Sequence, residues 1–266
     1  RAAQMLSTLV IISAIAPVIG PLLGGQIVTI ASWRAVFWLL VVMGAAMFIA
    51  LWWLPETLPE EKRVKASLGG VFKNYGLLLT NVAFMRYTLC LTSFYVAAYA
   101  FIAGSPFVYI SYFGVDPQHY GWLFALNVVG VMLMSVVNRR IVHRYPLETL
   151  LKISLLVAGA AAIVLAIGAR WQIGGLLLIV VSVFVLFSMN GIIAATSTAA
   201  ALDAAPNVAG SASALIGALQ YGSGIISSLL LATLSDGTPW TMAWIMALFT
   251  LVSTAIALTT RARAVS

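Results

Sequence analysis

The stretch PVIGPLLGG (residues 17–25) decides the fold, because it lies in an uncharged apolar run yet contains two prolines and three glycines. Proline removes a backbone hydrogen bond and bends a helix, and lipid tolerates such a bend where a neighbouring helix satisfies the freed groups. Glycines four residues apart let a second helix backbone approach closely, which is how helices associate in membranes. We therefore expect a kinked membrane helix with a close-packed contact face.

The composition of the whole chain agrees with a membrane environment. Of its 266 residues, 62% are hydrophobic and 8% are charged, and the mean hydropathy is +1.06. A soluble domain carries roughly 25% charged residues, so this chain has too few to cover a surface in water. Its expected solvent is the lipid bilayer, and its pI of about 9.8 reports membrane topology rather than a nucleic-acid partner.

Eight apolar runs are long enough to cross the hydrocarbon core, which takes roughly 20 helical residues. They cover approximately residues 5–30, 33–54, 83–111, 120–142, 149–169, 173–199, 211–234 and 240–259. Because backbone groups in lipid must be satisfied within their own segment, these runs should be α-helices. The predicted fold class is an all-α membrane protein with eight transmembrane helices.

Charged side chains indicate how the chain is oriented. All seven acidic residues lie outside the apolar runs or at their edges, and twelve of the 14 Lys and Arg residues fall on one side of the membrane. These twelve are Arg1, Lys62, Arg63, Lys65, Lys73, Arg86, Arg139, Arg140, Arg144, Lys152, Arg261 and Arg263. Arg34 and Arg170 fall on the other side. By the positive-inside rule the larger group is cytoplasmic, and eight crossings then place both termini in the cytoplasm.

One long polar interruption, residues 55–82, divides the apolar runs. We expect it to be a cytoplasmic linker between the last two helices of one bundle (1–54) and a six-helix bundle with a short tail (83–266). Within the linker, LGGVFKNYGLLL (68–79) is either an amphipathic piece that lies flat on the membrane or part of a plain solvated tether.

A shift of 207 residues aligns the first pair of apolar runs with the last pair. Trp33 then overlies Trp240, and the small and polar face of the first run overlies that of the seventh. Two parallel repeats joined by a linker are the build of major facilitator transporters. Because only two runs precede the linker and the chain begins at Arg1, we expect it to be about the last two-thirds of a twelve-helix protein.

GPLLGG (20–25) matches the core of the antiporter motif in the fifth helix of drug:proton antiporters of the major facilitator superfamily. Further stretches resemble the bicyclomycin/chloramphenicol-resistance (Bcr/CflA) family of that superfamily. They are SWRAVFWLL (32–40), PETLPEEKR (55–63), GSPFVYI (104–110), YGWLFALN (120–127) and APNVAGSASAL (205–215). The resemblance implies helices 5 to 12 of a major facilitator fold, in a multi-pass protein of the bacterial inner membrane.

The same resemblance assigns the first run to the contact between the two bundles. The residues it implicates in sealing that contact against leak are Pro17, Gly20, Pro21, Gly24 and Gly25. The family motif usually carries another glycine upstream, near Ser13, where this chain has SAIAP, so the full motif is not met. Generic packing of small residues is the alternative explanation for each glycine.

Polar groups inside a membrane are costly and tend to mark transport pathways. The six candidates for substrate contact are Tyr95, Tyr99, Asn127, Asn190, Gln220 and Tyr221. Aromatic rings with a few hydrogen-bonding groups suit bulky, partly apolar compounds. The resemblance places the helices of Tyr95, Tyr99 and Gln220 along the central cavity. Alternatively, these groups only bond the backbone or bridge helices, for about 0.6–2 kcal/mol each.

The basic cluster NRRIVHR (138–144) follows the fourth run and resembles the inter-helix loop of the family's second half. Its Arg139, Arg140 and Arg144 are candidates for a cytoplasmic gate, although anchoring of the topology is the favoured interpretation. No Asp or Glu lies at membrane depth in the eight runs. Proton coupling therefore requires an acid elsewhere, which we expect in four preceding helices.

These features favour a proton-coupled multidrug exporter of the bicyclomycin/chloramphenicol type that works by alternating access; the alternative is a major facilitator exporter of a sugar or small metabolite. The expected partners are drugs or metabolites, protons and the lipid bilayer, and the whole protein is expected to be a monomer. We expect no cofactor, no metal site and no catalysis. The histidines His119 and His143 lie in loops on opposite faces, and no nucleophile–base pair is evident.

Overall fold

A computed structural model describes residues 23–24, 26–27, 30–53 and 68–259 of the chain. These residues form helices and turns and contain no strand. Seven of their helical segments are long and apolar enough to cross a membrane, which confirms the predicted all-α membrane fold. The chain divides into two compact units, residues 1–67 and 68–266.

In the first unit, α2 (Trp33–Ala50) continues as the short 3-10 turn η1 (Leu51–Trp53) and matches the predicted run 33–54. Aromatic and basic side chains gather at its start. The rings of Trp33 and Phe37 meet edge to face with centroids 5.9 Å apart, and the Arg34 guanidinium lies 4.5 Å from the centroid of the Trp33 ring. A helix that is apolar on all sides, as α2 is, suits lipid or a helical neighbour rather than water.

Most of the predicted run 5–30 lies outside the described residues. Pro17, Gly20, Pro21 and Gly25 of the antiporter motif fall there as well. Gly24 is described and has helical backbone. The contact role of these five residues therefore stays a prediction, as do the domain boundaries at the linker.

The second unit contains six membrane-spanning segments. They are α4 (Val82–Pro106) with its π-helical continuation η3 (Phe107–Tyr112), α5 (Pro117–Ile141), α6 (Leu147–Trp171), the pair α7 (Gly175–Ser188) and α8 (Asn190–Asp203), the pair η4 (Pro206–Val208) and α9 (Ala209–Leu234), and α10 (Trp240–Thr259). Their bounds agree with the last six predicted runs to within a few residues. Local chemistry sets some ends: Asp116 caps α5 by accepting a hydrogen bond from the Gln118 N–H at 2.8 Å.

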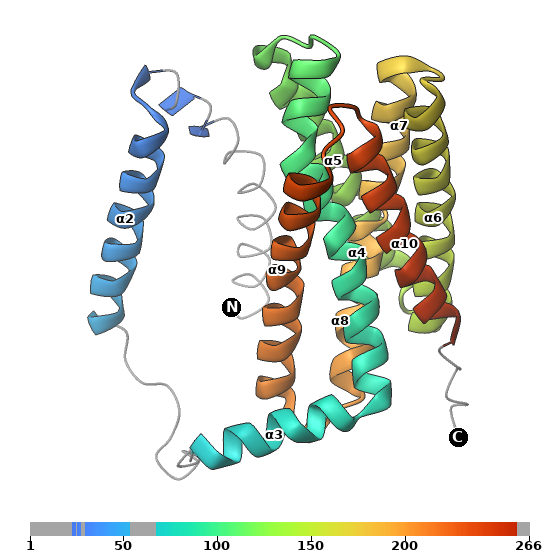
Figure 1. Cartoon of the computed structure of the whole chain (residues 1–266). Helices are drawn as coiled ribbons and strands as arrows, with labels where there is room; N and C mark the ends of the chain where they lie inside the picture. Colours follow the sequence, from blue (N-terminus) through green and yellow to red (C-terminus); the bar gives the residue numbers. More distant parts are fainter. Residues whose placement is uncertain (1–22, 25, 28–29, 54–67, 260–266) are drawn as a thin grey trace. The chain divides into compact units, whose positions relative to one another are not determined.

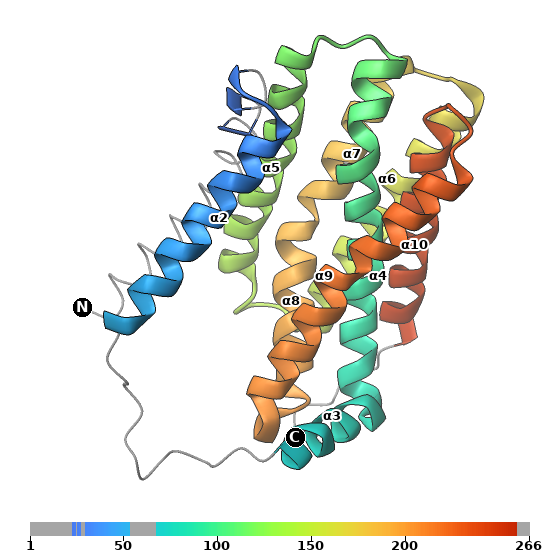
Figure 2. The ribbon, with the colours of Figure 1, turned by 60° about the vertical axis from the view of Figure 1, so that its left-hand side comes forward.

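The core of the second unit surrounds α4, which packs against α8, α9 and α10 (Figures 1 and 2). Phe94 and Phe101 of α4 are fully buried. The Phe101 ring stacks on Phe124 of α5 at 6.0 Å and meets Phe187 of α7 edge to face at 5.2 Å. Because aromatic pairs of this kind add to simple apolar burial, α4 is held in a fixed orientation among its neighbours.

Two glycines let α5 approach the α7–α8 segment closely. A Cβ atom added to Gly191 would lie 2.6 Å from the backbone nitrogen of Ser135, and one added to Gly130 would lie 2.8 Å from the ring of Phe184. Both distances are too short for a real Cβ atom: a side chain at Gly191 would push against the α5 backbone, and one at Gly130 would displace the side chains of Phe184 and Ser188. Close approach of this kind is common in membrane proteins. Lipid gives helices no hydrophobic reason to associate, so they associate through van der Waals packing at small residues.

Residues 68–80, the second half of the predicted linker, form α3 (Leu68–Thr80), which runs crosswise at one end of the second unit (Figures 1 and 2). Leu78 of α3 is buried against α4 and α9. Asn81 at the α3–α4 corner accepts a hydrogen bond from the Phe84 N–H at 3.1 Å and donates one to the Ala204 carbonyl at 2.9 Å. This part of the linker is therefore a packed helix rather than a plain tether.

Candidate substrate site

Helices α4, α8 and α9 bring together five of the six residues that the sequence singles out for substrate contact. Tyr95 and Tyr99 lie four residues apart and share one face of α4, with ring centroids 6.0 Å apart. Asn190 is the first residue of α8, and Gln220 and Tyr221 come from the middle of α9. We call these five residues the tyrosine–amide cluster.

The hydroxyl of Tyr95 lies close to the other polar groups of the cluster. It faces the side chains of Asn190 and Gln220 and lies near Tyr221. The Asn190 side-chain oxygen is buried and accepts no hydrogen bond from the described residues. A buried acceptor without a partner costs free energy, which a bound molecule that donates a hydrogen bond would recover.

The cluster is partly open. Tyr95 and Tyr99 are half-buried, whereas Tyr221 is 70% exposed within the second unit. Gly224, one turn along α9 from Gln220, lies against the Tyr99 ring: a Cβ atom added there would be 3.5 Å from the ring carbons. The ring thus rests on α9 backbone, and the site combines aromatic walls with two amide groups.

The helix that carries Asn190 is irregular for one residue just before it. The structure divides the sixth predicted run into α7 and α8 at Met189, and the hydrogen bond from the Met189 N–H to the Val185 carbonyl is stretched to 3.4 Å. Met189 keeps helical backbone dihedrals, and Gly175–Asp203 still forms one stretch that is long and apolar enough to cross a membrane. The predicted run 173–199 is thus one span, and SMNG (188–191), with an asparagine and a glycine, coincides with its irregular turn.

Asn127, the sixth candidate, makes none of the cluster's contacts among the described residues. It lies in α5, is buried, and donates from its side-chain nitrogen to the Leu123 carbonyl at 2.9 Å. Its side-chain oxygen accepts no hydrogen bond from the described part of the chain. The nitrogen of the Asn127 side chain thus bonds the backbone, as the alternative interpretation predicted, whereas its oxygen does not.

The basic candidates lie at the end of α5. Arg139 and Arg140 occupy its last turn, Arg144 follows in the turn to α6, and all three are exposed. Cations at a helix C-terminus are favourable next to the macrodipole. This placement suits a topology anchor, and a gating role for the three arginines stays a prediction.

A hydrogen bond between Glu148 and Tyr87 was not predicted from the sequence. Glu148, in the first turn of α6, is only 9% exposed, and its carboxyl accepts a hydrogen bond from the Tyr87 hydroxyl of α4 at 2.9 Å. Its second oxygen has no hydrogen-bond partner among the described residues. Because 61 residues separate the pair, no local pattern could have joined them. Among the described residues, no three His, Cys, Asp or Glu side chains come together as metal ligands.

These observations define the class: a multi-pass helical membrane protein with a polar cluster at the junction of three packed helices, which suits a solute transporter. Residues 1–228 match the model of the Major Facilitator Superfamily. The chain belongs to this family, whose members carry small molecules rather than catalyse reactions.

Three bacterial relatives support the assignment. The chain is 34% identical over 234 residues to YdgK, an uncharacterized MFS-type transporter of Bacillus subtilis. This alignment covers 85% of the present chain and 57% of YdgK. It is 28% identical over 252 residues to a bicyclomycin resistance protein homolog of Haemophilus influenzae, an alignment that covers 94% of this chain and 63% of that protein. It is also 28% identical over 217 residues to multidrug resistance protein D of Escherichia coli, with 81% of this chain and 54% of that protein covered. The chain therefore spans between about half and two-thirds of these relatives, and the predicted resemblance to the bicyclomycin-resistance branch is confirmed.

Proposed function

We propose that the whole protein is a proton-coupled exporter of bulky, partly apolar drugs and works by alternating access. The names of two relatives, a bicyclomycin resistance protein homolog and multidrug resistance protein D, support drug efflux. The charge distribution supports a bacterial inner membrane protein with both ends of this chain in the cytoplasm.

The tyrosine–amide cluster is the observation that carries the proposal. Drug-binding pockets are mostly apolar, with a few polar groups that fix the ligand. Here Tyr95 and Tyr99 supply ring faces, whereas Asn190 and Gln220 supply hydrogen-bonding groups. The unpaired oxygen of Asn190 selects substrates that carry a hydroxyl or N–H donor.

Two roles complete the proposed cycle. The antiporter motif seals the contact between the bundles through Gly20, Pro21 and Gly24. This seal holds while the substrate site switches from opening on one side of the membrane to opening on the other. The coupling acid lies outside the tyrosine–amide cluster, since none of the five side chains is acidic. The protein works as a monomer, because two bundles within one polypeptide suffice for alternating access.

Drug uptake into energised inverted vesicles tests the proposal, with the whole protein present. We expect uptake of a bicyclomycin- or chloramphenicol-type compound that a protonophore abolishes. Tyr95→Phe should weaken transport roughly fivefold, because one hydrogen bond is worth about 1 kcal/mol. Asn190→Ala should act in the same direction.

Tyr109→Phe is the matched control. Tyr109 is fully buried in η3, and its hydroxyl has no hydrogen-bond partner among the described residues, so the same atom is removed away from the cluster. Equal losses in Tyr95→Phe and Tyr109→Phe would count against the cluster. Proton-driven uptake of a sugar or metabolite, with none of the drugs, would establish the alternative exporter.

A further inference from the structure

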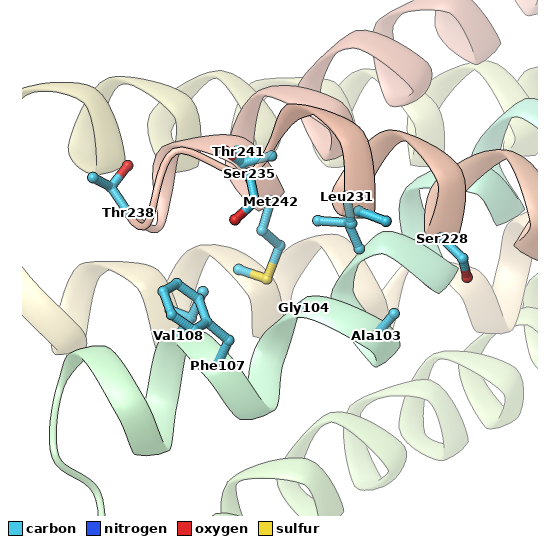
Figure 3. Close-up of a pocket in the computed structure, with 11 residues that line it drawn as sticks. Ala103, Gly104, Phe107, Val108, Ser228, Leu231, Ser235, Thr238, Thr241 and Met242 are labelled. Carbon is cyan, nitrogen blue, oxygen red and sulfur yellow. The ribbon is translucent and has the colours of Figure 1, made fainter.

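A cavity of about 450 Å³ lies between α4, α9 and α10, near the Pro106 end of α4 (Figure 3). Its volume falls within the range of small-molecule sites, roughly 300–1,000 Å³. Phe107, Leu231 and Met242 form apolar walls, and Ala103, Ser228 and Ser235 are among the smaller residues that leave the space open.

The cavity continues the tyrosine–amide cluster along the same two helices. Tyr99 of α4 touches Gly224 of α9, and four residues further along each helix, Ala103 and Ser228 both line the cavity. Four helical residues rise about 6 Å, so the two sites are one turn apart. A molecule that leaves the tyrosine rings towards the Pro106 end of α4 therefore meets this cavity next.

The chemistry of the cavity resembles that of the cluster. Its walls are apolar, and its hydroxyl groups include those of Ser228 and Ser235, both of which are exposed. Two exposed hydroxyls can each donate and accept, so they match ligands of either kind. Met242 adds a flexible wall, because its unbranched side chain adapts to different shapes.

Two local features shape the cavity. At Gly104 an added Cβ atom would lie 3.0 Å from Cγ of Met242, so only glycine lets that side chain pack there without displacement. Beyond Pro106, α4 changes to the π-helical segment η3, and π-helical turns occur frequently at functional sites.

The loop at the cavity mouth is fixed by Asp236. Its carboxylate accepts hydrogen bonds from the Thr238 N–H at 3.0 Å and from the Thr238 and Thr241 hydroxyls at 2.8 Å each. Partial burial raises the pKa of Asp236, but these hydrogen bonds outweigh it and hold the pKa below its ordinary value. The mouth therefore has a defined wall.

We propose that this cavity is a second, outer subsite, which holds a bulky apolar substrate with hydrogen-bonding groups after it leaves the tyrosine–amide cluster. The inference rests on the proposed function and deepens it. In the proposed orientation the Pro106 end of α4 faces away from the cytoplasm, so the subsite lies on the exit side.

Thiol protection in the whole protein tests the subsite, with chloramphenicol as the probe. The chain's single cysteine, Cys90, is buried, so Ser228→Cys introduces one accessible thiol here; cysteines outside this sequence are replaced by serine. At a probe concentration ten times its Kd, labelling of Ser228→Cys by a maleimide should slow about tenfold. Thr233→Cys, an exposed α9 position that does not line the cavity, should label at an unchanged rate.

A matched pair of variants tests transport. Ala232 lines the cavity and Thr233, its neighbour, does not. Ala232→Phe should lower export at least fivefold and Thr233→Phe less than twofold, about the factors for 1 and 0.4 kcal/mol. Export without protection of Ser228→Cys, or equal losses in the two phenylalanine variants, would overturn the subsite alone. If the unmodified protein exports no drug at all, the proposed function fails, and the subsite with it.

Discussion

At the scale of single residues, the buried carboxyl of Glu148 stands out because it joins two helices that are distant in sequence. Tyr87, which is half-buried, donates to it at 2.9 Å, and Glu148 itself is 9% exposed. A buried carboxyl group that loses its donor keeps the cost of desolvation without compensation. We therefore expect the pair to contribute to the stability of the bundle, whereas the role proposed for the tyrosine–amide cluster is in transport.

Tyr87→Phe should destabilise the protein by about 1–3 kcal/mol, because the variant leaves the carboxyl without this hydrogen bond. Glu148→Gln should cost less, since its amide oxygen still accepts from Tyr87. The measurement is the thermal unfolding midpoint, Tm, of the purified whole protein in detergent. Tyr145→Phe, an exposed tyrosine in the turn before α6, is the control. A Tm equally lowered in Tyr87→Phe and Tyr145→Phe would show that the pair contributes nothing.

At the scale of helices, the sequence predicted where the described spans lie but not where one of them becomes irregular. Span positions follow from apolar length, which is a local property. Gly191, two residues beyond the irregular turn at Met189, packs on α5 beside Ser135, about 56 residues away in sequence. Such a contact between distant segments leaves only a weak local signal.

Gly191→Ala should separate α5 from α8, because the added Cβ atom has no room beside the Ser135 backbone. Overpacking of this kind costs about 1–3 kcal/mol, so the Tm should fall. Gly76→Ala is the control: Gly76 is exposed in α3, and an added Cβ there meets no described atom within 4 Å. Alanine favours helix over glycine, so this variant should keep or raise the Tm. A Gly191→Ala protein as stable as the Gly76→Ala protein would refute the close approach.

At the scale of the whole molecule, membrane polarity is a strong filter: five of the six candidate residues come together in the structure, and their role in substrate contact stays a prediction. Few amide side chains occur in the spans, and the side chains of Tyr95 and Tyr99 share a face by helical spacing alone. Asn127 passed the same filter, yet it bonds the Leu123 carbonyl of its own helix. Sequence cannot separate the two outcomes, because the position of a helix face depends on all its neighbours.

Charge predicts the orientation of the molecule, and α5 offers a direct test of that prediction. His119 lies in its first turn and His143 just beyond its last, both exposed. The 25 residues of α5 span roughly 37 Å, more than the hydrocarbon core of about 30 Å, so the two positions face opposite compartments. Because the arginine cluster adjoins His143, the positive-inside rule places that end in the cytoplasm.

A membrane-impermeant maleimide should therefore label His119→Cys in intact cells and His143→Cys only in inverted vesicles. The chain without either substitution is the control, because its one cysteine, Cys90, is buried. Labelling of His143→Cys in intact cells would show that the molecule has the opposite orientation in the membrane. The cavity beside Met242 would then open towards the cytoplasm and serve entry rather than exit, because it lies at the same end of the second unit as the start of α5 (Figures 1 and 2).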